Sequence, residues 1–113
     1  MNIVTIKRGD TLVLTGVYKQ SNGIVMNLTG YVLEINIINS SDRTVATIKS
    51  DNVTSNRSVV ITDAINGAFT LVVKDTEAFK DDDYYYIDFK AVGSNGYEQT
   101  SKALRLKIKN KLV

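Results

Sequence analysis

The sequence contains no cysteine and no histidine among its 113 residues. Without cysteine the chain can form no disulfide, no thiolate nucleophile and no cysteine-bound metal site. Without histidine it lacks the commonest general base, the commonest zinc ligand and every catalytic triad that depends on an imidazole. These absences exclude several classes of enzyme, so we expect a protein that is not an enzyme, with no cofactor and no metal site.

Other missing features concern membranes and nucleic acids. The opening residues, MNIVTIKRGD, hold no basic region followed by an apolar run and no small-residue cleavage site, so they do not form a signal peptide. No apolar stretch approaches the length of about 18 residues that a membrane-spanning helix needs. The formal net charge is only +2, far from the basic field of a typical nucleic-acid binder. We therefore expect no membrane insertion and no nucleic-acid partner.

What the sequence does contain is apolar and polar residues that alternate with a period of two. In residues 31–39, for example, Leu33, Ile35 and Ile37 fall on one side and Glu34 and Asn36 on the other. Side chains of a β-strand point alternately to its two faces, so this pattern predicts strands with one buried face. We expect seven or eight strands, over residues 3–7, 11–19, 31–39, 44–49, 57–62, 67–74, 84–92 and 98–109.

The segments between these stretches are rich in turn-forming residues. SNG, LTG, NSSD, NG and SNG occur at 21–23, 28–30, 39–42, 66–67 and 94–96. Asn and Gly accept positive φ, and Asn, Ser and Asp side chains bond the nearby backbone. KDTEAFKDDD, at 74–83, instead predicts one helical turn near 75–80 that crosses between sheets. The pattern predicts a single all-β domain over residues 1–113, a two-sheet antiparallel β-sandwich.

Three consecutive tyrosines form the most distinctive aromatic feature. The period of two directs Tyr85 into the core, where its hydroxyl is expected to reach a loop carbonyl, and leaves Tyr84 and Tyr86 exposed. Exposed tyrosines favour interfaces because they bury a large area and keep a polar tip. A contact with another protein subunit is the favoured interpretation, and stacking against a sugar is the alternative.

The last predicted strand carries basic residues on one face, at positions 105, 107, 109 and 111. No aromatic residues alternate with them for base stacking, which argues against a nucleic-acid stripe. Lysines also discourage edge-to-edge aggregation, so we expect this strand to lie at the edge of a sheet. The candidate interface therefore comprises Tyr84, Tyr86, Arg105, Lys107 and Lys109.

Two short motifs invite a functional interpretation that the local sequence does not favour. Arg8-Gly9-Asp10 is the tripeptide of adhesive ligands, but it stands between two predicted strands, where Gly and Asp suit a turn. Asp81-Asp82-Asp83, with Asp75 and Glu77 nearby, invites a calcium site. Consecutive carboxylates point in different directions, whereas a calcium loop spaces its ligands at alternate positions, so a solvated acidic loop is favoured.

The order of turns and strands along the chain resembles that of a known protein family. It runs from a basic-Gly-Asp turn and an alternating strand to a polar Gly turn, an Asn27-Leu28-Thr29-Gly30 step and a further strand. The second half adds Gly67-Ala68-Phe69, Asp75-Thr76-Glu77 and residues 85–89, YYIDF. This order is similar to that of immunoglobulin-like domains in bacteriophage tail and baseplate proteins, among them the N-terminal domain of the siphophage upper baseplate protein family.

The resemblance implies an immunoglobulin-like β-sandwich that serves as a structural component of a virion. Such a component would be assembled in the bacterial host cytoplasm and incorporated in a tail, a baseplate or a fibre anchor. Its partners would be other tail or baseplate proteins, with a trimer or hexamer of the chain itself as a further form. The alternative function is a β-sandwich module that binds carbohydrate or a host surface. The family supplies no catalytic residue to transfer to this chain.

Overall fold

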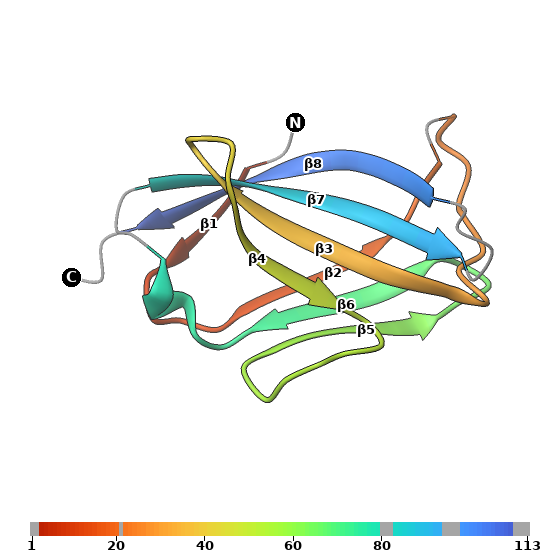
Figure 1. Ribbon diagram of the computed structural model, residues 1–113, viewed down its shortest axis with the longest axis horizontal. Coiled ribbons are helices and arrows are strands. Elements are labelled where there is room, and N and C mark those ends of the chain that lie inside the picture. The colour runs from red at the N-terminus through yellow and green to blue at the C-terminus, as the bar shows by residue number, and fades with distance from the viewer. Residues whose placement is uncertain (1–2, 21, 80–82, 94–97, 110–113) are drawn as a thin grey trace.

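The protein folds into two β-sheets packed face to face (Figure 1). The structure, a computed structural model, describes residues 3–20, 22–79, 83–93 and 98–109. The larger sheet has the strand order β1-β8-β7-β3-β4 and the smaller has the order β2-β6-β5. The elements are β1 Ile3–Lys7, β2 Leu12–Val17, β3 Tyr31–Asn39, β4 Thr44–Lys49, β5 Arg57–Asp63, β6 Ala68–Val73, the 3₁₀ turn η1 Thr76–Ala78, β7 Asp83–Gly93 and β8 Glu98–Lys109.

The all-β sandwich predicted from the alternation is confirmed, with eight strands. The expected bounds agree with the observed ones to within two residues, and the predicted helical turn is η1, which lies between β6 of one sheet and β7 of the other. The agreement has a simple cause. Each strand keeps one apolar face, and burying that face against the opposite sheet is the main gain in free energy that folding offers it.

The core is the layer of side chains between the two sheets. Phe69 from the small sheet packs against Phe89 from the large one, with ring centroids 5.4 Å apart. The Tyr18 hydroxyl, also buried, donates a hydrogen bond to the Phe89 carbonyl at 3.4 Å. The residues whose exposure does not exceed 2% are mostly aliphatic and include Leu12, Leu28, Leu33, Ile35, Ile37, Ile48, Val59, Leu71, Val73, Ile87, Ala91, Leu106 and Ile108.

The last strand is not at a sheet edge, so that prediction is wrong. β8 lies between β7, which it pairs with antiparallel, and β1, which it pairs with in parallel from Ile3 opposite Arg105 to Lys7 opposite Lys109. The edges of the large sheet are β1 and β4. Alternation shows which face of a strand is buried, but it carries no information on which distant strand will pair with it.

Helices contribute little to the fold. The only helical element in the described ranges is η1, and none of those ranges contains a helix long and apolar enough to cross a membrane.

Two glycines with positive φ allow the turn geometry to be tested. Gly67 closes the β5–β6 connection at φ +69°, and a Cβ there would lie 2.7 Å from the Met26 carbonyl oxygen and 2.9 Å from that of Tyr18. Gly23 has φ +85° but no atom within 4 Å of the same position. Both sites disfavour a side chain by conformation, and only Gly67 disfavours it by contact as well.

We expect Gly67→Ala to destabilise the fold more than Gly23→Ala does. The Gly23 variant should lose about 1–2 kcal/mol from the left-handed conformation alone. The Gly67 variant should lose about 1–3 kcal/mol more, because the methyl group forces the backbone apart. Urea unfolding of the two variants measures the difference, and equal losses would contradict the contact argument.

Candidate functional site

The outer face of the large sheet brings the predicted interface residues together. In the register of β7 and β8, Tyr84 lies directly opposite Lys107 and Tyr86 directly opposite Arg105. Directly opposite residues of an antiparallel pair project to the same side of the sheet. Their neighbours Tyr85, Leu106 and Ile108 are buried on the inner side. The period of two thus places aromatic and basic side chains on one outward surface.

The basic side chains on this face are held against the tyrosine rings. The Arg105 guanidinium carbon lies 4.9 Å from the ring centroid of Tyr84 and 5.7 Å from that of Tyr86. The Lys107 ammonium nitrogen lies 5.2 Å from the Tyr84 centroid. Each such cation–π contact contributes about 0.5–1 kcal/mol at an exposed site. The contacts limit the rotamers of long side chains and so fix the pattern of charge on the surface.

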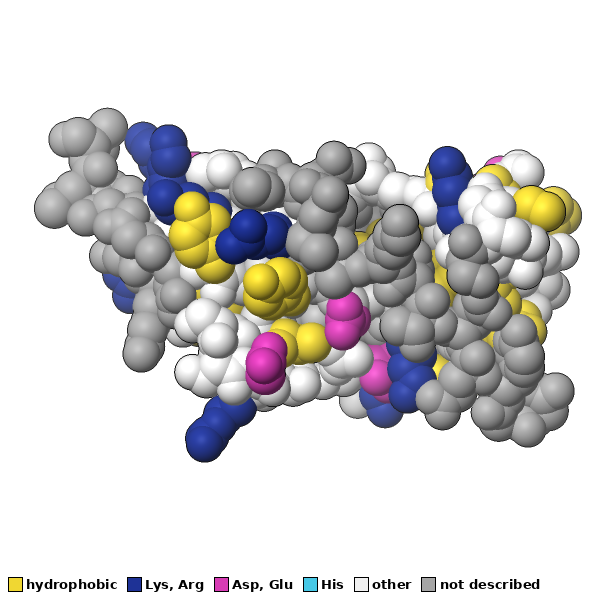
Figure 2. All heavy atoms as spheres, turned by 90° about the horizontal axis from the view of Figure 1, so that it is seen from above, with side chains coloured by type: hydrophobic (Ala, Val, Ile, Leu, Met, Phe, Trp, Pro, Cys, Tyr) yellow, Lys and Arg dark blue, Asp and Glu magenta, His cyan; other side chains and the backbone are white. Residues whose placement is uncertain are grey.

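A fourth basic residue joins this group from β1. Lys7 lies opposite Lys109 in the parallel β1–β8 pair, and both side chains are exposed. We call Lys7, Tyr84, Tyr86, Arg105, Lys107 and Lys109 the tyrosine–basic surface. Figure 2, which views the large sheet from outside, shows hydrophobic and basic side chains side by side on this face. Sequence analysis missed Lys7 because nothing local indicates that β1 pairs with β8.

The structure therefore gathers all five candidate residues, Tyr84, Tyr86, Arg105, Lys107 and Lys109, and their role as an interface stays a prediction. Tyr85 is buried as expected, and its ring packs on Phe79 with centroids 5.1 Å apart. Lys111, which the sequence placed on the same face, lies outside the described residues.

The structure describes only part of the acidic segment at residues 81–83. Asp81 and Asp82 lie outside the described residues, and Asp83 is described only by its place at the start of β7. Asp75, a suggested companion in a calcium site, instead binds Arg57. Within the described ranges, no three Asp, Glu, His or Cys residues are grouped closely enough to hold a metal ion.

The Arg8-Gly9-Asp10 segment forms the turn from β1 to β2, and the side chain of Thr76 holds it. The Gly9 N–H donates to the Thr76 hydroxyl oxygen at 2.9 Å, and that hydroxyl donates to the Asp10 carbonyl at 2.5 Å. Thr76 is fully buried. We call this pair of hydrogen bonds the Thr76 bridge. Gly9 has φ +97°, which explains the need for glycine at this position.

The Arg8 side chain lies against η1. Its Nε donates to the Phe79 carbonyl at 2.8 Å and to the Glu77 carbonyl at 3.1 Å, and one terminal nitrogen donates to the same Glu77 oxygen at 2.9 Å. The guanidinium thus satisfies carbonyls near the end of a short helical turn, which otherwise have no partner within the helix. In this structure the tripeptide is a packed turn.

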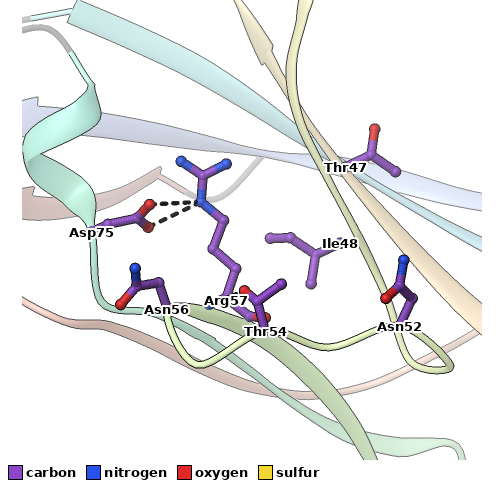
Figure 3. Close-up of a pocket in the computed structure, with 7 residues that line it drawn as sticks. All are labelled: Thr47, Ile48, Asn52, Thr54, Asn56, Arg57 and Asp75. Atoms are coloured by element: carbon purple, nitrogen blue, oxygen red, sulfur yellow. Dashed lines mark hydrogen bonds and ion pairs between the residues drawn. The ribbon is translucent and has the colours of Figure 1, made fainter.

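A polar hollow of about 510 Å³ lies between β4 and the start of β5 (Figure 3). Sequence analysis placed no site here, because hydroxyl and amide side chains in loops are also ordinary turn chemistry. The Arg57 Nε lies 2.9 and 3.1 Å from the two carboxylate oxygens of Asp75, so the two charges offset each other. The residues that line the hollow are Thr47, Ile48, Asn52, Thr54, Asn56, Arg57 and Asp75.

No protein-family model matches the chain, and no curated protein matches it significantly. The two features with a distinct chemistry are the tyrosine–basic surface, built on β1, β7 and β8, and the polar hollow, built on β4, β5, their connecting loop and Asp75, which follows β6.

We expect Thr76→Val to destabilise the protein by about 1–3 kcal/mol, because it removes the partner of the Gly9 N–H and of the Asp10 carbonyl. Thr15→Val is the matched control, since Thr15 is exposed on β2 and should change stability by no more than about 0.5 kcal/mol. Urea unfolding measures both. If the two variants lost the same stability, the Thr76 bridge would not stabilise the fold.

Proposed function

We propose that this chain is a structural component of a bacteriophage virion, part of a tail, a baseplate or a fibre anchor. It acts by binding other virion proteins through the tyrosine–basic surface. One observation carries the proposal: two tyrosines and three basic residues from two strands share one outward face. The order of turns and strands that resembles phage tail and baseplate domains supports the virion as the setting.

The chemistry of the surface suits protein binding. Tyrosine and arginine are enriched where interfaces concentrate their binding energy. Tyrosine buries a large area with few rotatable bonds, and the planar guanidinium of arginine offers several hydrogen-bond donors and stacks on aromatic rings. Tyr84 has 37% of its surface exposed, and Tyr86, Arg105 and Lys107 are partly exposed. The rings already hold Arg105 and Lys107 in place, so less side-chain entropy is lost when a partner binds.

The charge on the surface also limits how copies of the chain can associate. In a two-fold contact through this face, the lysines and Arg105 of one copy would face those of the other, which is unfavourable. A head-to-tail contact instead places the face against a different part of the next copy and can close into a ring. Self-association through this face is therefore expected as a head-to-tail ring rather than as a two-fold dimer, and the resemblance to tail and baseplate proteins suggests a trimer or hexamer.

The first test is the solution mass, measured by light scattering over a wide concentration range, together with binding to purified tail and baseplate proteins of the phage that encodes the chain. We expect a ring or a stable complex. Tyr84→Ala and Arg105→Ala should each weaken it by about tenfold or more, as expected for residues at the centre of an interface.

Lys74→Ala is the control for this test, because Lys74 is exposed after β6 and lies away from the tyrosine–basic surface. It removes one positive charge, as Arg105→Ala does, and should leave assembly unchanged. A chain that stays monomeric at every concentration and binds no tail or baseplate protein would overturn the proposal.

The second candidate function is a module that binds carbohydrate or a host surface, and the polar hollow favours it. Hydroxyl, amide, guanidinium and carboxylate groups together offer both donors and acceptors, as a neutral sugar requires. Because Arg57 and Asp75 offset each other, the site does not demand a charged ligand. The volume of about 510 Å³ is in the range of small-molecule sites.

A glycan array followed by titration tests this second function. If a sugar binds in the hollow, Asn52→Ala should weaken binding about fivefold, the value of roughly one hydrogen bond. Tyr84→Ala should leave the affinity for the sugar unchanged. If Tyr84→Ala weakens binding and Asn52→Ala does not, the sugar stacks on the tyrosines instead. An array without hits would exclude the candidate.

A further inference from the structure

We infer that the partner segment bound by the tyrosine–basic surface is an extended, acidic stretch of protein with carboxylates at every second residue. The inference rests on the proposed function, since it names the chemistry of the partner for the same surface. Charge, spacing and the state of the tyrosine rings each support it.

The first support is a local excess of positive charge, with four cations on this face and one carboxylate, Asp88, on the outward side of β7. Lys7, Arg105, Lys107 and Lys109 lie on adjacent strands, and none of them forms an ion pair with another described residue. Two ion pairs within the described ranges, Lys49 with Glu34 and Arg57 with Asp75, involve none of these four cations. An unpaired group of like charges on one face attracts a partner of the opposite sign and repels one of the same sign.

The second support is the spacing of the cations. Arg105, Lys107 and Lys109 occupy alternate positions of β8, and alternate residues of a strand are about 6.5–7 Å apart. An extended peptide has the same repeat, so carboxylates at positions i, i+2 and i+4 would each meet one cation. Lys7 lies beside Lys109 across a strand spacing of about 4.8 Å and adds a second donor at that end.

The third support is Arg105 itself. Its Nε is buried and has no hydrogen-bond partner among the described residues. Its guanidinium lies near two aromatic rings instead of a carboxylate. A partly desolvated cation without a counter-ion raises the free energy of the unbound protein, so a carboxylate that reaches the rest of the guanidinium gains a strong charge-assisted contact.

The rings also favour a protein segment over a single-stranded nucleic acid. Nucleic-acid surfaces of this type rely on open aromatic faces on which bases stack. Here the Arg105 and Lys107 side chains both lie over the Tyr84 ring, and Arg105 also lies over the Tyr86 ring. Because cations lie against these rings, a partner meets positive charge here together with the exposed part of Tyr84.

Two synthetic peptides test the inference on the full chain by fluorescence anisotropy. One has Glu at every second position with Ser between, and the other has the same composition with its Glu residues consecutive. We expect the alternating peptide to bind about fivefold more tightly or better, and its binding to weaken as salt is raised. Lys107→Ala should weaken it up to about fivefold, and Lys74→Ala should not.

Equal binding of the two peptides would overturn the inference, because it would reflect general attraction of a polyanion. Tighter binding of a single-stranded oligonucleotide than of the alternating peptide would overturn it in favour of a nucleic acid. The proposed function is judged separately. If a tail protein binds through Tyr84 and neither peptide competes, the acidic segment is wrong and the assembly surface stands.

Discussion

One buried hydroxyl, that of Thr76, joins two turns that are far apart in the sequence. The Thr76 bridge ties the end of β1 to η1, and η1 leads into β7. Arg8 adds a second tie between the same two segments through the Glu77 and Phe79 carbonyls. Hydrogen bonds thus connect the segments that adjoin β1 and β7, two of the three strands that carry the tyrosine–basic surface, in addition to the pairing within the sheet.

Within the sheet, two different rules build the tyrosine–basic surface. The period of two decides which residues point outward, and it acts within each strand. The register decides which residues become neighbours, and it acts between strands: it sets Tyr84 beside Lys107 and Lys7 beside Lys109. The ring contacts of Arg105 follow from both rules. A shift of one residue in β8 would turn its cations into the core, which the burial of Leu106 and Ile108 prevents.

Sequence patterns predicted what depends on neighbours along the chain and missed what depends on distant ones. The strands, the inward side of Tyr85 and the helical turn follow local periodicity and turn chemistry. The pairing of β1 with β8 and the role of Thr76 join residues separated by most of the chain, and the Arg57–Asp75 pair joins the two ends of the β5–β6 hairpin, 18 residues apart. The prediction that β8 lies at a sheet edge failed for this reason, because its pairing with the short strand β1 depends on residues far away in the sequence.

The parallel pairing of β1 with β8 also orders events during synthesis. The first strand emerges from the ribosome long before the residues it pairs with, so it stays without its partner until Lys109 has been made. The four cations therefore lie together only after β8 has been made and has paired with both β7 and β1. A chain interrupted before β8 would present the tyrosines of β7 without their cations, and it would have no complete surface to offer a partner.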